Sequence, residues 1–343
     1  MLGLGHEPLE YSHLGLQRIV ERHLESVLDS IDRGKAAVLP GRPLYTDLIE
    51  TIDDLAPCTG HGPATLRELA SLLAAGPSVS TAQTPLQCNG SANLCPLRYN
   101  QVAYPTTHNS FSEFYRFATP NQLRTIPEQL AFGIRGLMLD VYYAYDELRL
   151  CHGECDSASG YITFSDTLGD LKAFLDAHPQ DVLTLVFENY VTPQQLGQAF
   201  TAAGLGPYLY AYNGHTWPTL QQMITTNQRL VIFSDNLPLD QLGANRGHRD
   251  YPWLHDQFSL AFQTPFTYNF KHNMGRGNTD YCKVDRGNGN GIFILNHFIS
   301  PPSYITADEV NGYTFQLDSA LYCQEQRGRF PNFVAVDFEN CDS

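Results

Sequence analysis

Eight short apolar segments, separated by segments with helical periodicity, limit the possible folds of this chain more than any other feature. The predicted strands cover residues 102–107, 136–142, 148–151, 182–188, 229–234, 259–263, 292–297 and 333–337. Several are apolar at nearly every position, which is typical of strands buried on both faces of a parallel sheet. Helices are predicted at residues 165–177, 193–203, 219–225 and 306–322. This alternation predicts an α/β fold, a (β/α)8 TIM-type barrel of regular or distorted form, with residues 243–290 as loops over one face.

The N-terminal quarter of the chain has a different pattern. Residues 16–31 carry apolar side chains at intervals of three and four, which predicts an amphipathic helix. A second helical segment covers 64–75, and residues 78–87 are rich in Ser, Thr, Ala, Gln and Pro, as linkers are. We therefore expect a small helical extension and linker over residues 1–85, joined to a barrel domain over residues 86–343.

The net negative charge of the chain limits the classes of partner that it can bind. Thirty-six Asp and Glu against 21 Lys and Arg give a net charge of −15, and no basic run is present. Nucleic acid is therefore not an expected partner, and strong adsorption to an anionic membrane is opposed. Aromatic residues at 142–145 and 258–270 are interpreted as core packing or as a surface for transient membrane contact. We predict no protein partner.

The cysteines indicate an oxidising compartment. There are eight, an even number, and they can be grouped as Cys88/Cys95, Cys151/Cys155, Cys282/Cys323 and Cys58/Cys341. Zinc binding is the alternative, but no pair has the two-residue spacing of a zinc ribbon or finger. Disulfides favour a secreted or extracytoplasmic protein. The chain shows neither a signal peptide nor an apolar run of the ~18 residues that a membrane-spanning helix needs.

Polar side chains follow nearly every predicted strand. In a parallel barrel the carboxyl ends of the strands meet on one face, which is where function gathers. The residues at these ends are His108, Asn109, Asp140, His152, Glu188, Asn189, Asp235, Asn296, His297 and Asp337. A single polar residue of this kind would be interpreted as structural, with its side chain hydrogen-bonded to a partner, because a buried polar group without a partner costs stability. Their convergence predicts an active site, in which two histidines can serve as general base and general acid on a phosphodiester.

Five motifs in sequence order resemble those of the phosphatidylinositol-specific phospholipase C X-domain superfamily. Over about residues 86–343, the chain is most similar to its secreted bacterial and fungal PLC-like phosphodiesterase branch. The motifs are Thr107-His108-Asn109-Ser110, Gly133-Ile134-Arg135 running to Leu139-Asp140, Leu150-Cys151-His152-Gly153, Leu185-Val186-Phe187-Glu188-Asn189 and Val334-Ala335-Val336-Asp337-Phe338.

The resemblance implies a role for each catalytic residue. His108 would deprotonate the nucleophile, which is a neighbouring substrate hydroxyl or a water, and His152 would protonate the leaving alkoxide. Asp337 would orient His108 and fix its tautomer. Arg135 would offset phosphate charge, or would be structural, since its strand parity differs from that of Asp140.

A divalent metal is also implied. Asn109, Asp140 and Glu188 stand where calcium-dependent members have oxygen ligands, whereas Met138 replaces an acidic ligand. Metal-free members have an arginine at the position of Asp140, so a cation, calcium rather than magnesium, is expected to neutralise the phosphate here. In the alternative, the two acids pair with Arg135 or hold the histidines.

Two further residues are expected at the substrate. Asp235 is predicted to hydrogen-bond a substrate hydroxyl, and His297 to reach the substrate or to be structural. The resulting prediction is a phosphodiesterase that cleaves a P–O bond of a phospholipid or related phosphodiester. A glycerophosphodiester phosphodiesterase is the alternative enzyme, disfavoured because Met138 occupies the place of a second acid. A catalytically silent binding module is the third reading, disfavoured because His108 and His152 are both present.

Overall fold

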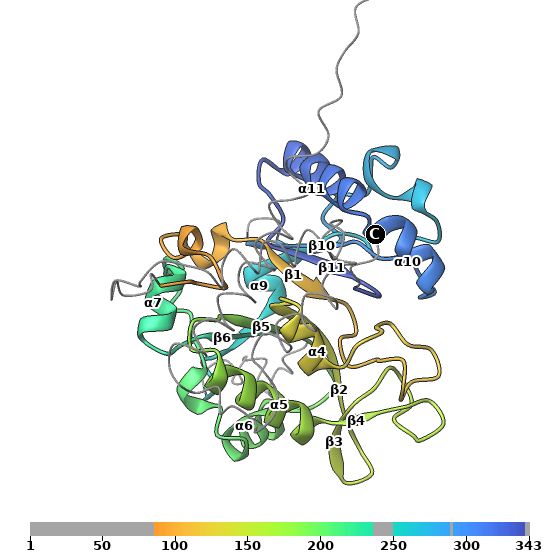
Figure 1. Ribbon diagram of the computed structural model, residues 1–343. Helices are drawn as coiled ribbons and strands as arrows, with labels where there is room; N and C mark the ends of the chain where they lie inside the picture. Colours follow the sequence, from red (N-terminus) through yellow and green to blue (C-terminus); the bar gives the residue numbers. More distant parts are fainter. Residues whose placement is uncertain (1–85, 236–249, 289–290, 340–343) are drawn as a thin grey trace, which may run out of the picture. The chain divides into compact units, whose positions relative to one another are not determined.

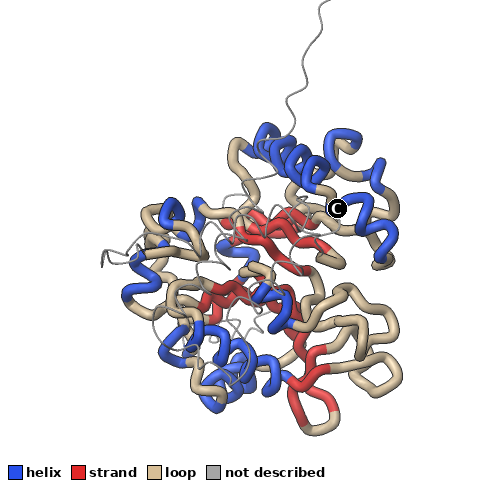
Figure 2. The backbone as a smooth tube through the Cα atoms, viewed as in Figure 1, coloured by secondary structure: helices blue, strands red, loops and turns tan. Residues whose placement is uncertain are grey.

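The computed structural model describes residues 86–235, 250–288 and 291–339. A curled sheet lies at the centre with helices around it (Figures 1 and 2). Its strands are β1 Tyr104–Thr107, β2 Gly136–Ala144, β3 Glu147–Leu150, β4 Ile162–Thr163, β5 Leu183–Asn189, β6 Leu230–Ser234, β7 Leu254–Asp256, β8 Ala261–Gln263, β9 Arg286–Gly287, β10 Ile292–Asn296 and β11 Phe333–Val336. The helical extension predicted over residues 1–85 lies outside the described residues and stays a prediction.

The helices follow the strands along the chain. The α-helices are α4 Ile126–Ala131, α5 Phe164–Ala177, α6 Pro193–Ala202, α7 Leu220–Thr225, α9 Gln257–Leu260, α10 Tyr304–Asn311 and α11 Tyr313–Arg327. Short 3-10 helices are η1 Ala92–Leu94, η2 Tyr99–Gln101, η3 Gly206–Tyr208, η4 Lys271–Asn273 and η5 Gly275–Gly277. The single helix predicted at 306–322 is two helices, because the backbone turns at Gly312.

The strand order explains how the carboxyl ends of the strands converge. Along the sheet the order is β7-β6-β5-β2-β1-β11-β10-β8-β9, and every neighbouring pair from β7 to β8 is parallel. Among the described residues no strand pairing joins β7 to β8, so the sheet is open there. At this opening the side-chain amides of Gln257 and Gln263 are 3.2 Å apart. The α/β fold is confirmed, whereas a closed (β/α)8 barrel is not.

One predicted barrel strand has a different role. Residues 148–151 correspond to β3, which pairs antiparallel with both β2 and β4 and so forms a hairpin beside the parallel sheet. The parallel strand that takes its place is β7, which lies within the stretch 243–290 that was expected to form loops. With only three residues, β7 is too short to show a strand pattern in the sequence.

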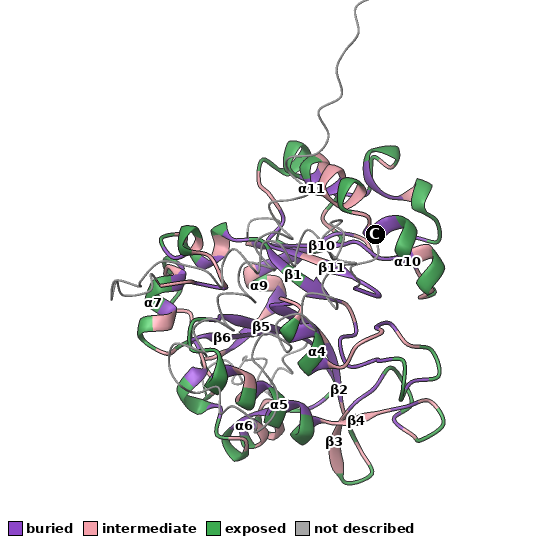
Figure 3. Cartoon of the chain, viewed as in Figure 1, coloured by how far each residue is buried: buried purple, intermediate pink, exposed green. Residues whose placement is uncertain are grey.

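Two apolar layers hold the curled sheet, and Figure 3 shows its parallel strands mainly as buried, whereas β3 and β4 are mostly intermediate. Successive side chains of a strand point to opposite faces, so each strand contributes to both layers. The concave side is filled by aromatic and aliphatic side chains that include Tyr104, Phe233 and Phe333. On the convex side, Leu171 of α5 and Phe200 of α6 pack with the other face of β2, β5 and β6. The polar residues at the strand ends are therefore attached to a well-packed sheet.

Three of the four predicted disulfides are present: Cys88–Cys95, Cys151–Cys155 and Cys282–Cys323. Cys58 and Cys341 lie outside the described residues. The Cys151–Cys155 bond closes the short loop that contains His152. The Cys282–Cys323 bond joins the segment before β9 to α11, and thereby fixes this helix to the edge of the sheet.

Candidate active site

A cavity of about 200 Å³ lies at the carboxyl ends of the parallel strands and is called the active-site cavity below. Six of the nine predicted site residues line it: His108, Asn109, Asp140, His152, Glu188 and Asp235. Asp337 adjoins it through its contact with His108. Arg135 and His297 are not among the residues that line it.

His108 is held on two sides. Its Nδ1 lies 2.9 Å from Oδ1 of Asp337, and its ring stacks on Phe298 with 3.8 Å between ring centroids. Its side chain keeps 22% exposure, whereas that of Asp337 keeps only 3%. With Nδ1–H donating a hydrogen bond to this carboxylate, the neutral imidazole presents an unprotonated Nε2 that can act as a base. The ring thus has a fixed plane, a fixed tautomer and access to solvent.

A chain of amides orients the carboxylate of Asp337. Asn121 donates from Nδ2 to Oδ1 of Asp337 at 3.0 Å, and its own Oδ1 accepts from Nδ2 of Asn109 at 3.3 Å. Asn109 has a positive φ of 44°, a conformation that asparagine tolerates better than most residues. The same network therefore connects the predicted base to a predicted metal ligand.

His152 faces the same cavity from a different element. It lies in the loop between β3 and β4, directly after Cys151, and is exposed. The disulfide to Cys155 limits the freedom of this loop. Two imidazoles of different surroundings therefore share one cavity: His108 with an acidic partner, and His152 open to solvent.

Three carboxylates line the same cavity as the two histidines. Asp140 and Glu188 are paired across β2 and β5, and Asp235 follows β6, the next strand. Asp140 is 4% exposed, and burial, together with the charges of Glu188 and Asp235, raises its pKa to about 8. Burial also raises the pKa of Asp235, although the backbone N–H of Asn189 donates to its Oδ1 at 2.9 Å. Burial in this cavity therefore opposes the ionisation of both Asp140 and Asp235.

These residues fit a hard cation by their chemistry. Two carboxylates and an amide oxygen, from Asp140, Glu188 and Asn109, are the type of ligand that calcium and magnesium take. In the described part of the chain, no three His, Cys, Asp or Glu side chains are arranged as a ligand set. A site here would therefore depend on the amide of Asn109 and on water.

Arg286 is a cavity residue that sequence reasoning missed. Its guanidinium lies 5.3 Å from the ring centroid of Phe258 and 5.0 Å from that of Phe266. Among the lining residues that the structure describes, it is the only Arg or Lys. Its charge lowers the pKa of Asp235, against the larger effect of burial. Its Nε also lies 3.9 Å from Oδ2 of Asp285.

Arg135 lies away from the cavity. It precedes the first residue of β2, whereas Asp140 is in the middle of that strand. Its Nε lies 3.1 Å from Oδ1 of Asp181, and Nη1 donates to the carbonyl oxygens of Leu130 and Ile134 at 2.8 Å each. These bonds satisfy the buried guanidinium and join α4 to the sheet. The placement favours the structural alternative over the predicted phosphate role.

His297 points to the convex side of the sheet. Asn296 and Phe298 line the active-site cavity, so the residue between them faces the other way. Its Nε2 is 2.8 Å from the carbonyl oxygen of Val310, and Nδ1 contacts the hydroxyl of Tyr281. Burial lowers its pKa to about 4, only partly offset by the bond to Val310. His297 is a neutral core histidine, and its placement favours the structural alternative over contact with substrate.

The chain is similar to a known protein family and to individual proteins from other organisms. The family model of the PI-PLC X domain (PI-PLC X 1) matches residues 94–343. The PI-PLC X domain-containing protein 1 of Arthroderma benhamiae is 31% identical over 301 residues, which covers 79% of this chain and 91% of that protein. A PI-PLC X domain-containing protein of Arabidopsis thaliana is 28% identical over 269 residues, and the match spans 71% of this chain but only 59% of the plant protein.

A further relative and a solved structure agree with these matches. An uncharacterized secreted protein of Arthroderma benhamiae is 27% identical over 274 residues, which covers 74% of this chain and 60% of that protein. The phosphatidylinositol-specific phospholipase C from Listeria monocytogenes superposes with a TM-score of 0.51 at 12% identity, over 75% of this chain and 96% of that one. The structural likeness concerns the fold.

Proposed function

The chain belongs to the PI-PLC X-domain family, and on that premise we propose that it is a phosphodiesterase that cleaves a P–O bond of a phospholipid or related phosphodiester. One observation carries the proposal. His108, held by the carboxylate of Asp337, lines the same cavity as His152. A base with a fixed tautomer and a second imidazole on one cavity are what general acid–base cleavage requires.

The chemistry divides between the two histidines. Nε2 of His108 takes the proton from the attacking oxygen, a substrate hydroxyl or a water, while that oxygen forms its bond to phosphorus. His152 gives its proton to the departing alkoxide as the P–O bond breaks. Attack by a substrate hydroxyl yields a cyclic phosphate, and attack by water yields a linear one. Asp337 stabilises the imidazolium that forms on His108.

Cations must offset the phosphate charge. Arg286 offers its N–H groups at the cavity wall. Asn109, Asp140 and Glu188 would hold a divalent cation, calcium ahead of magnesium, because their oxygens are hard ligands. When bound, the ion supplies Lewis-acid polarisation of the phosphoryl oxygens.

Transient membrane contact is part of the proposal. Exposed aromatic side chains lie near or after the carboxyl ends of β1, β2 and β5, the strand ends that line the active-site cavity: Phe114, Tyr115, Tyr143, Tyr145 and Tyr190. Each is more than half exposed, and tyrosine suits the boundary between water and lipid. None of the described helices has the length and apolarity that crossing a membrane requires.

Secretion is proposed on two observations. Three disulfides are present, and such bonds persist mainly in oxidising compartments. One relative is described as a secreted protein. Growth of a host that exports the full-length protein, followed by thiol counting of the purified product, would test the oxidised state.

Variants of the two histidines test the mechanism. His108→Ala and His152→Ala are each expected to lower kcat by about 10²–10⁴-fold, because each removes one proton-transfer group. His215→Ala, which removes an exposed imidazole that does not line the active-site cavity, is the matched control and should retain activity. Circular dichroism of each variant verifies the fold. Full activity in His152→Ala would contradict the proposed acid.

A further inference from the structure

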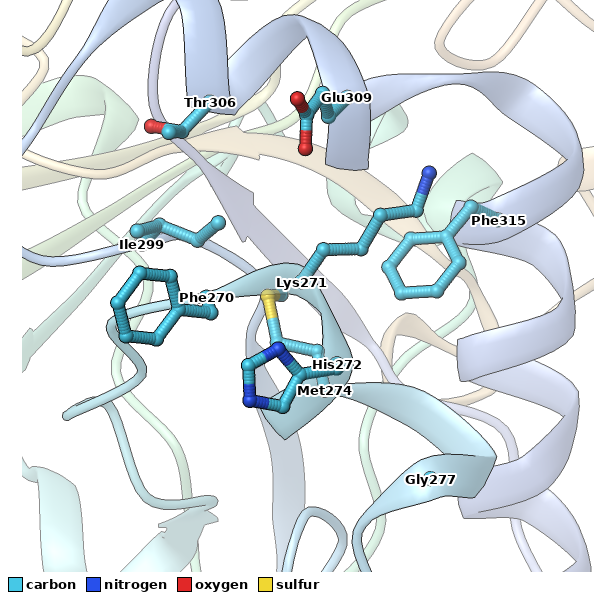
Figure 4. Close-up of a pocket in the computed structure, with 9 residues that line it drawn as sticks. All are labelled: Phe270, Lys271, His272, Met274, Gly277, Ile299, Thr306, Glu309 and Phe315. Carbon is cyan, nitrogen blue, oxygen red and sulfur yellow. The ribbon is translucent and has the colours of Figure 1, made fainter.

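A second cavity, of about 560 Å³, lies beside α10 and α11 (Figure 4). Its volume is within the range of small-molecule sites. The residues that line it are Phe270, Lys271, His272, Met274, Gly277, Ile299, Thr306, Glu309 and Phe315. None of them belongs to the proposed acid–base or metal site.

One side of the second cavity is apolar. Met274 and Ile299 are buried, and Phe270 and Phe315 complete the surface. Ile299 lies between Phe298 and Ser300, which both line the active-site cavity. The segment after β10 is therefore a wall with the active-site cavity on one side and the second cavity on the other.

The other side is polar and carries two opposite charges. Thr306 and Glu309 are three residues apart on α10, so they share one face of the helix. Figure 4 shows the side chain of Lys271 extended across the cavity toward Glu309 and Phe315, and its Nζ lies 4.9 Å from the ring centroid of Phe315. Within the described residues, neither Lys271 nor Glu309 forms an ion pair.

We propose that the second cavity binds a neutral amphiphile with one alkyl chain and a hydroxyl-bearing head, of the monoacylglycerol class. The alkyl chain would contact Met274 and Ile299. A hydroxyl both accepts and donates hydrogen bonds, so it can accept from the ammonium of Lys271 and donate to the carboxylate of Glu309. The two charges cancel, so a charged head gains from one and is repelled by the other.

Ligands of this class resemble the alcohol that the proposed reaction would release. Cleavage of a glycerophospholipid on the glycerol side of the phosphate releases an acylglycerol, so the second cavity would hold a product-like alcohol. That relation rests on the proposed function. Binding itself involves no residue of the acid–base pair, so it can be measured whether or not the chain hydrolyses phosphodiesters.

Isothermal titration of the full chain with glycerol ethers tests the site. Hexyl, octyl and decyl glycerol ethers, all below their micelle concentrations, should bind with Kd falling about fourfold per methylene, because each methylene leaves water. Octanoate and octyltrimethylammonium should bind more weakly than the octyl glycerol ether. Absence of a chain-length dependence, or tighter binding of either ion, would overturn the proposal.

Variants locate the binding in this cavity. Thr306→Trp, which fills the cavity, should abolish binding of the octyl ether. Glu309→Gln should tighten octanoate and Lys271→Gln should tighten octyltrimethylammonium, whereas Asp308→Gln, an exposed carboxylate outside the cavity, should change neither. Unchanged affinities in the first three variants would refute the assignment.

An inactive variant separates the two proposals. His108→Ala should bind the octyl ether with the affinity of the unmodified chain. Loss of activity with retained binding supports both proposals, and activity without any binding in the unmodified chain refutes only the second cavity. Binding by a chain that hydrolyses no phosphodiester refutes only the proposed function.

Discussion

Asp140 is the cavity residue whose charge is least well accommodated. Burial and the nearby carboxylates raise its pKa to about 8, whereas an unfolded chain has an aspartate pKa of about 3.9. Between these values the folded protein holds a proton that the unfolded chain releases. The contribution of Asp140 to stability therefore decreases as pH rises through this window, and above about pH 8 the folded state carries the full cost of the ionised group.

Replacement of Asp140 by asparagine should relieve this cost. In chelator, Asp140→Asn is expected to be more stable than the unmodified chain above pH 8, on the order of a few kcal/mol, with the difference shrinking toward pH 4. Calcium should raise Tm of the unmodified chain and not that of the variant. Denaturant unfolding across this pH range measures both effects, with Asp308→Asn as an exposed control. Parallel pH profiles for the unmodified chain and Asp140→Asn would contradict the electrostatic account.

His297 is a second single residue whose pKa is shifted by burial, but its pKa is lowered, whereas that of Asp140 is raised. Its pKa of about 4 lies below the unfolded value of about 6.5, so the unfolded chain binds the proton first as pH falls. His297→Gln should cost about 1–3 kcal/mol of stability at pH 7 through its bonds to Tyr281 and Val310, with kcat within about twofold. Unfolding curves and kinetics together measure this, and a large loss of kcat in a stable variant would restore a substrate role.

Whether a residue of a strand points to the concave or the convex face of the sheet decides which site residues could be predicted from the sequence. His108, Asp140, Glu188 and Asp337 could be predicted because each ends an apolar run on the concave parity. For His297 the sequence left a substrate role and a structural role open, although it is one residue out of register with Asn296, which has that parity. The loop positions of Asn121 and Arg286 could not be predicted, because no periodic pattern fixes where a loop side chain meets the cavity.

Among the elements, the short strands were the hardest to predict. β7 has three residues and is defined by its pairing with β6 rather than by its own sequence. β3 has a strand pattern as clear as any, yet it pairs antiparallel, because the turn after β2 at Tyr145 and Asp146 returns the chain at once. Local sequence therefore predicted strands but not their partners.

The disulfide that joins the segment before β9 to α11 should stabilise the fold more than the Cys88–Cys95 disulfide does. Cys282 and Cys323 are 41 residues apart and Cys88 and Cys95 are 7 apart, so the loop-entropy relation gives about 4 and about 2 kcal/mol. Replacing both cysteines of each pair by alanine, followed by denaturant unfolding, should reproduce this order. Equal losses in the two double variants would show that loop length does not govern the effect.

In the molecule as a whole, the open edge between β7 and β8 lies beside the active-site cavity. Gln257 and Gln263, which adjoin the opening, line the cavity together with residues from the ends of most other parallel strands. The rigid sheet thus holds His108 and Asp337, whereas a disulfide-closed loop carries His152. This division explains how one imidazole is fixed and the other remains exposed.

The most direct test of the central claim is phosphorus NMR of a panel of phosphodiesters, including phosphatidylinositol and glycerophosphodiesters, incubated with the chain in calcium, in magnesium and in chelator. The account predicts a new phosphate resonance, cyclic or linear, with at least one ester, that depends on the divalent cation and is lost in His108→Ala and in His152→Ala. An unchanged spectrum for every ester in every condition would contradict it, and so would turnover that survives removal of both imidazoles.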